Sequence, residues 1–199
     1  YSSAASDVYK RQADETGKWK TSLPTPAAGG PYTITISDGK KIQLSNVMIG
    51  EVWICSGQSN MEMPLAGWGK VLHYEQEIAT ANHPAIRLFQ VKKTTSITPS
   101  EEVQSTMDGW QPCAPETVEN FSSVAYFYAR ELNRELDVPV GVIDVSWGGT
   151  VAEAWTSEET LKHMPDFEDM LSILNIAKTD KAAAEQKYQV TRQNWEQEM

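Results

Sequence analysis

Alternation of polar and apolar residues marks the first segment with a clear structural preference. Residues 32–45, YTITISDGKKIQLS, alternate on both sides of Asp38-Gly39. An Asp-Gly pair between two alternating runs is a strong hairpin signal, because both turn positions tolerate a positive φ. The pattern therefore predicts an antiparallel pair of strands.

After Gly50 the pattern changes to continuous apolar runs. These runs are VWICS (52–56), IRLFQV (86–91) and VGVIDVSW (140–147). Such runs are typical of strands covered on both faces, and here they alternate with longer stretches of helical period. The chain is therefore predicted to have an α/β fold, a three-layer parallel sheet with helices on both faces.

Two segments have the pattern of long helices. Residues 122–136, SSVAYFYARELNREL, begin with Ser122 as the expected N-cap, and residues 180–199 form a second, polar helical pattern. In the first helix, the apolar positions predicted to face the core are Val124, Phe127, Tyr128, Leu132 and Leu136.

Composition and charge narrow the class of protein. The 199 residues are 40% apolar and 22% charged, which is typical of a soluble globular chain. The formal net charge is −10, so a nucleic acid backbone would be repelled, and no apolar run approaches the roughly 18 residues of a membrane span. We expect neither nucleic acid nor membrane as a partner, whereas oligomeric state is left open.

Both chain ends have unusual sequences. Residues 1–12, YSSAASDVYKRQ, lack an initiator Met and any hydrophobic periodicity, so we expect a non-native tail there and exclude it from fold prediction. The chain stops inside the helical pattern at Met199, which predicts that this is not the natural end of the gene.

Cys55 and Cys113 suit neither a disulfide framework nor a metal site, and Cys55 is expected to be a buried apolar residue.

Ser59 is the first candidate for chemistry. It follows the predicted strand 52–56 by the turn Gly57-Gln58, and ligands in open α/β sheets bind beyond the carboxyl ends of the strands. A glycine permits a sharp turn, and a helix starting there would aim free backbone N–H groups at a group bonded to Oγ. These are the requirements of a nucleophile with an oxyanion intermediate, although Ser59 could also be an ordinary turn or N-cap residue.

The string DVSWGGT, residues 144–150, is the second candidate. It ends the third apolar run with Gly148 and Gly149 at the same predicted edge of the sheet. A backbone N–H of either glycine could approach a developing negative charge. The alternative interpretation is an ordinary turn between a strand and a helix.

Three strings together resemble a known family. GEVWICSGQSNMEMPL (50–65) and GVIDVSWGGTVAEAWTS (141–157), preceded by AAGGPYTITI (27–36), closely resemble the sialate O-acetylesterases, a branch of the SGNH hydrolases. The resemblance runs from about Ala13 to the end of the chain. It implies that residues 13–47 are the end of a β-sandwich domain. Residues 48–199 would then be the N-terminal portion of an esterase domain.

The resemblance also implies roles for individual residues. Ser59 would be the nucleophile, and its own N–H would serve the oxyanion hole. A second oxyanion N–H would come from Gly149, with Gly148 as the other candidate. The implied reaction is two-step acyl transfer that releases acetate from an O-acetylated carbohydrate, without a metal or cofactor, in a secreted or periplasmic protein.

Other parts of the family pattern have no counterpart in residues 1–199. The missing parts are a third oxyanion donor, in a WYQGES-like string, and the Asp-x-x-His pair that would supply the general base. His73, His83 and His163 are interpreted as surface helix or loop residues, not as the base. Because a serine without a base is a poor nucleophile, we expect the 199-residue chain alone to be inactive.

Two tryptophans are weaker candidates for substrate binding. Trp68 follows the Ser59 string and Trp155 follows the GGT string, so either could stack on a sugar ring. Both could equally be packing anchors.

The sequence is compatible with two substrates, acetylated sialate and acetylated xylan. A further alternative is a carbohydrate-binding module without catalysis, in which Ser59 is only a polar contact.

Overall fold

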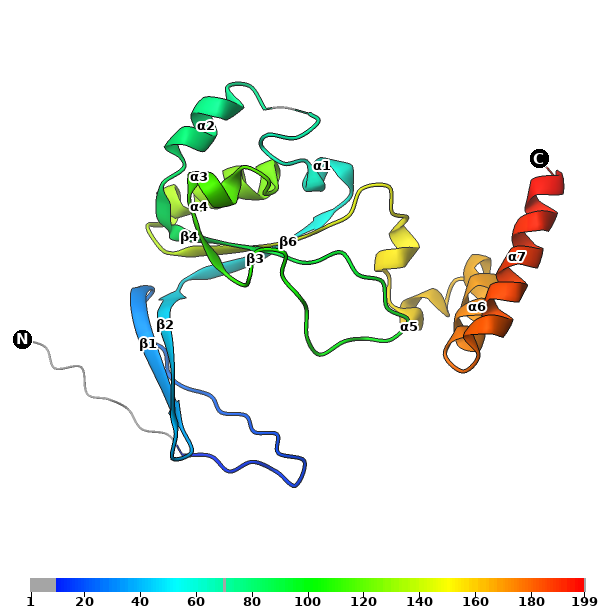
Figure 1. The fold of residues 1–199 in the computed structure, drawn as a ribbon, viewed down its shortest axis with the longest axis horizontal. Coiled ribbons are helices and arrows are strands. Elements are labelled where there is room, and N and C mark those ends of the chain that lie inside the picture. Colours follow the sequence, from blue (N-terminus) through cyan, green and yellow to red (C-terminus); the bar gives the residue numbers. More distant parts are fainter. Residues whose placement is uncertain (1–9, 70, 199) are drawn as a thin grey trace, which may run out of the picture.

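An antiparallel hairpin forms a sheet of its own near the start of the chain. The computed structural model describes residues 10–69 and 71–198, so most of the segment 1–12 lies outside the described residues. Strands β1 (Gly29–Ser37) and β2 (Lys41–Ile49) pair with Ser37 opposite Lys41, and Gly39 in the turn has a φ of +116°. The hairpin predicted around Asp38-Gly39 is confirmed, and it extends away from the second sheet (Figure 1).

The second sheet contains the three predicted apolar strands and one short strand. Its order is β3-β6-β4-β5, comprising β3 (Glu51–Gly57), β6 (Val140–Ser146), β4 (His83–Gln90) and β5 (Gln111–Cys113). β3 and β4 both pair parallel with β6, so the α/β class is confirmed. β5 pairs antiparallel with β4, which makes the sheet mixed, and its three residues are too few for a pattern to predict.

Four helices lie on one face of this sheet (Figure 1). They are α1 (Ser59–Glu62), α2 (Tyr74–Thr80), α3 (Pro115–Val118) and α4 (Ser123–Leu136). The core lies between them and the sheet, where the large buried side chains are Leu65, Ile86, Leu88, Val118, Phe121, Tyr126, Val140 and Val142. Over the described residues the other face carries no helix, because the helices that follow β6 lie to one side of the sheet, so the predicted second helical layer is not found there. Trp110 covers part of this face, because its ring lies against Gly141 and Phe89.

Strand β3 departs from its prediction. A continuous apolar run predicted burial on both faces, yet Val52 is 61% exposed, Ile54 is 70% exposed and Trp53 is 42% exposed. That prediction is wrong because β3 is an edge strand and the described helices cover only one face. Cys55 points to the covered side and is buried, as predicted.

Helix α4 has the predicted cap, but its buried face agrees with the prediction only in part. The side chain of Ser122 accepts a hydrogen bond from the Ala125 N–H, which confirms the N-cap. The buried positions are Ser123, Ala125, Tyr126 and Ala129. Two alanines on this face let the helix approach the sheet closely. Phe127 and Leu132 of the predicted stripe are half-buried and pack against the core, as predicted. Val124 is 45% and Leu136 is 50% exposed, so the prediction is wrong at these two positions.

The C-terminal part of the described chain is helical and lies to one side of the sheet (Figure 1). It contains the 3₁₀ helices η1 (Ala152–Trp155) and η2 (Pro165–Phe167) and the α-helices α5 (Glu158–Leu161), α6 (Glu168–Ala177) and α7 (Lys181–Glu198). The long polar helix predicted at residues 180–199 is confirmed as α7, which packs against α6. None of the described helices is long and apolar enough to cross a membrane.

Ser122 joins helix α4 to the segment that carries Ser59. Its hydroxyl donates to the Met61 carbonyl at 2.6 Å and accepts from the Ala125 N–H at 3.2 Å. Ser122→Ala removes both bonds in a fully buried place, so we expect the free energy of unfolding to fall by about 1–2 kcal/mol. Urea denaturation followed by tryptophan fluorescence measures this change. An unchanged midpoint would contradict the role given to the cap.

Candidate active site at the carboxyl edge of the sheet

Ser59 lies at the junction between strand β3 and helix α1. Gly57, the last residue of β3, pairs in register with Ser146, the last residue of β6. Parallel pairing therefore brings the ends of both strands to one edge of the sheet. Ser59 is the first residue of α1, and its side chain is exposed. Its position beyond the carboxyl end of β3 agrees with the prediction.

The loop Trp147–Thr150 lies directly beside Ser59. The Trp147 N–H donates to the Gly57 carbonyl at 3.0 Å, which extends the pairing of β6 with β3 by one residue. A Cβ placed on Gly148 would lie 2.9 Å from Ser59 Oγ. The two strings singled out in the sequence thus meet in space. Gly149 has a φ of +76°, and a Cβ there would meet open space.

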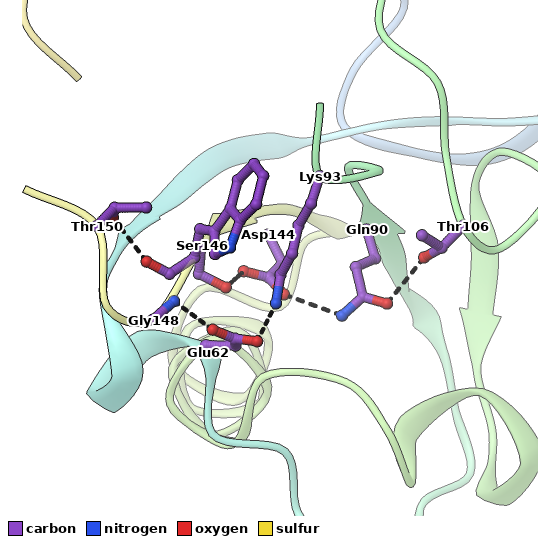
Figure 2. A network of polar contacts seen from close by, with 9 residues as sticks. Glu62, Gln90, Lys93, Thr106, Asp144, Ser146, Gly148 and Thr150 are labelled. Carbon is purple, nitrogen blue, oxygen red and sulfur yellow. Dashed lines mark hydrogen bonds and ion pairs between the residues drawn. The ribbon is translucent and has the colours of Figure 1, made fainter. Parts of the chain in front are cut away.

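A carboxylate that the sequence analysis missed lies between these two segments (Figure 2). Glu62, on α1, accepts a hydrogen bond from the Gly148 N–H through Oε2 and forms an ion pair with Lys93 through Oε1. The hydrogen bond from Lys93 holds the pKa of Glu62 below its usual value. The place of Glu62 in the string GQSNME was a signal for it. Lys93 could be found only once the strand order was known.

A second carboxylate is buried behind the loop. Asp144, on β6, is 2% exposed and accepts from Ser146 Oγ at 2.5 Å and from Gln90 Nε2 at 3.2 Å (Figure 2). Thr106 Oγ1 donates to Gln90 Oε1 at 2.8 Å, which fixes the orientation of the amide. Burial raises the pKa of Asp144. The hydrogen bonds around it make Asp144 a structural support of the β6 end.

The two candidate tryptophans are placed differently. Trp155, in η1, is 43% exposed. Its Nε1–H donates to Thr150 Oγ1 at 2.8 Å, so a hydrogen bond links this side chain to the Trp147–Thr150 loop. Trp68 lies in the turn after α1 and is 66% exposed. A side chain as exposed as Trp68 is a poor packing anchor. Stacking of either ring on a sugar stays a prediction.

None of the three histidines makes a hydrogen bond with Ser59 in the described part of the chain. His83 begins β4, so it lies at the opposite edge of the sheet, where its Nε2 is 3.4 Å from the Tyr126 hydroxyl. It is half-buried in a strand, so its interpretation as a surface helix or loop residue is wrong. His73 and His163 are exposed residues at the start of α2 and after α5. The described site therefore brings together the serine and the glycine loop without a histidine base.

Neither a metal nor a reactive thiol is suggested by the described residues. They contain no group of three or more His, Cys, Asp or Glu side chains that could hold a metal ion. Cys55 and Cys113 are free and buried, and burial raises the pKa of Cys113 to about 12. A thiol with so high a pKa stays protonated at neutral pH and is a poor nucleophile.

Together, these observations define an α/β protein whose polar groups gather at the carboxyl edge of a mainly parallel sheet. A family of carbohydrate esterases, described as sialic acid-specific acetylesterase, matches residues 49–189. The chain belongs to this family.

Individual relatives agree with this assignment. The chain is 32% identical to the sialate O-acetylesterase of Rattus norvegicus over 159 residues, which are 72% of this chain and 28% of the relative. It is 28% identical to the human sialate O-acetylesterase over 155 residues, covering 72% and 29% of the two chains. The crystal structure of a carbohydrate acetylesterase from Xanthomonas citri matches with a TM-score of 0.70 and 38% identity, over 76% of this chain and 34% of that one. The chain thus spans about a third of the length of these relatives, or less.

Proposed function

We propose that this chain contributes the nucleophile of a serine esterase that removes O-acetyl groups from sialic acid or related acetylated sugars. The observation that carries the proposal is the meeting of Ser59 with the Trp147–Thr150 loop, where a Cβ on Gly148 would lie 2.9 Å from Ser59 Oγ. A nucleophile beside a loop that offers backbone N–H groups is the arrangement that acyl transfer requires. Family membership and the names of the relatives point to the same chemistry.

The proposed reaction has two steps. Ser59 Oγ attacks the acetyl carbonyl carbon while a base takes the hydroxyl proton, and the tetrahedral intermediate collapses to an acetyl-serine and the free sugar hydroxyl. Water then attacks the acetyl-serine and releases acetate. The N–H groups of Ser59 and Gly149 would stabilise the oxyanion in both steps.

Glu62 is a poor choice for the base. Both of its carboxylate oxygens already have partners, and the hydrogen bond from Lys93 lowers its pKa. The resemblance to the family assigns the base instead to an Asp-x-x-His string, which has no counterpart in residues 1–199. We propose no metal or cofactor for the reaction.

Two sugars, sialate and xylan, are candidates for carrying the acetyl group. Sialate is acidic and the chain has a formal charge of −10, so long-range attraction does not favour it. Lys93 is already paired with Glu62. A sialate carboxylate would therefore need another cationic group.

We further propose that residues 13–47 end a β-sandwich domain and residues 48–199 begin the esterase domain. The separate β1–β2 sheet and a family match that starts at residue 49 support this division. By the same family resemblance we propose that the protein is secreted or periplasmic.

The test is acetate release from 9-O-acetylated sialic acid and from acetylated xylan, using the full protein encoded by the open reading frame that contains this chain. We expect Ser59→Ala to lower the rate by roughly 10⁴-fold or more, because it removes the nucleophile. Ser56→Ala, at an exposed serine near the end of the preceding strand β3, is the matched control and should keep the wild-type rate. If the folded wild-type protein releases no acetate but still binds the sugars, the chain belongs to a binding module instead.

A further inference from the structure

Glu62 connects three segments that follow three neighbouring strands. It lies on α1, immediately after β3, and its two oxygens contact Gly148 after β6 and Lys93 after β4. The sheet order β3-β6-β4 is what brings these segments together. Figure 2 shows the Glu62 carboxylate between the Gly148 nitrogen and the Lys93 ammonium. A single side chain thus ties the helix that carries Ser59 to the glycine loop.

The surroundings of Glu62 hold its carboxylate in place. Its side chain is 19% exposed, and each oxygen has its own charged or backbone partner. Hydrogen bonds to an ionised group are stronger than those between neutral groups. A carboxylate with both oxygens engaged has little freedom to move, so the position of Gly148 relative to α1 is fixed through it.

This contact has a consequence for the oxyanion hole. The Gly148 N–H donates to Glu62, so in this arrangement it does not serve an oxyanion at Ser59. Gly149, the next residue, has a φ of +76°, which is a conformation that glycine adopts readily. Of the two glycines considered, Gly149 is therefore the one left to donate.

We propose that Glu62 is a positioning residue that, paired with Lys93, holds the Trp147–Thr150 loop beside Ser59 and leaves Gly149 as the loop's oxyanion donor. This inference rests on the proposed function, since it assumes that Ser59 is the nucleophile. Besides holding the Glu62 carboxylate in place, Lys93 also has an electrostatic effect on the oxyanion. A carboxylate close to a developing oxyanion would oppose it, and the ammonium of Lys93 offsets that negative charge.

The proposal predicts an order of activities in the full protein, measured as kcat and KM with p-nitrophenyl acetate. Glu62→Ala removes the acceptor for the Gly148 N–H and should lower kcat about 100-fold with KM changed less than about 3-fold. Glu62→Gln keeps an oxygen that can accept this bond, so its kcat should be about 10-fold higher than that of Glu62→Ala. Lys93→Met leaves an unpaired negative charge near the oxyanion and should lower kcat more than Glu62→Gln does.

A double variant separates charge from packing. Glu62→Gln combined with Lys93→Met has no uncompensated charge, so its kcat should exceed that of Lys93→Met alone. A purely structural role would make the double variant as slow as the worse single variant, or slower. The matched control is Glu158→Gln, whose carboxylate forms ion pairs with Lys162 and Lys178 away from the site and should leave kcat unchanged.

The outcomes distinguish this inference from the proposed function. If Ser59→Ala keeps full hydrolysis, the proposed function fails and takes the inference with it. If Ser59→Ala abolishes hydrolysis while Glu62→Gln and Lys93→Met keep the wild-type kcat, only the role of Glu62 is refuted. A change in KM alone would also refute it. Should Glu62→Ala fail to fold in thermal melting, Glu62→Gln, Lys93→Met and the double variant decide the matter.

Discussion

Gly148→Ala is expected to lower kcat by roughly 100-fold while the protein stays folded. The added Cβ would lie 2.8 Å from Glu62 Oε2, 2.9 Å from Ser59 Oγ and 3.4 Å from Ser59 Cα. It therefore cannot be accommodated without moving the loop, Ser59 or the Glu62 carboxylate. A displacement of about 1 Å is enough for a loss of this size. Hydrolysis of p-nitrophenyl acetate by the full protein gives kcat, and thermal melting reports the fold.

Gly109→Ala is the control for this substitution. Gly109 lies in the loop before β5, has a φ of +86°, and a Cβ there would have no neighbour within 4 Å. The change strains the backbone but does not touch the site, so kcat should stay at the wild-type value. A fully active Gly148→Ala variant would show that the loop is not close to Ser59 in the working protein.

The largest expected effect on stability comes from Gly50→Ala. A Cβ on Gly50 would lie 1.9 Å from the Pro139 carbonyl oxygen and 2.7 Å from the carbonyl carbon, and a backbone group cannot rotate away as a long side chain can. The Glu51 N–H donates to the same oxygen at 3.0 Å, where the pairing of β3 with β6 begins. We expect the free energy of unfolding to fall by about 3 kcal/mol, measured by urea denaturation.

Val52→Ala, on the same strand, is the control for Gly50→Ala. Val52 is 61% exposed, so its truncation removes little buried area and should cost less than about 1 kcal/mol. Equal losses for the two variants would mean that the close approach of Gly50 to Pro139 does not matter for stability.

The fold was predictable where local pattern and tertiary packing agree. The Asp38-Gly39 hairpin and the Ser122 cap rest on turn and cap chemistry within a few residues, and both are confirmed. The exposure of Val52 and Ile54 could not be predicted, because an apolar run does not say whether its strand lies at the edge of a sheet. The buried face of α4 was predicted only in part for a related reason, since residue size alone does not show how closely a helix approaches a sheet.

The site was predictable only in part. Ser59 and the glycine loop could be expected to meet, because each follows an apolar strand and parallel strands bring their carboxyl ends to one edge. The pairing of Glu62 with Lys93 depends on β4 lying next to β6, which the sequence pattern does not specify. Long-range contacts of single charged side chains therefore became visible only in the structure.

The most direct test of the account is to identify the residue that a serine-reactive fluorophosphonate labels in the full protein. We expect one adduct, on Ser59, found by mass spectrometry of the peptide that contains it, with esterase activity lost in proportion to labelling. Ser59→Ala should take up no label at that peptide. Loss of activity with the adduct on another residue, or full activity with Ser59 completely labelled, would contradict the assignment of Ser59 as the nucleophile.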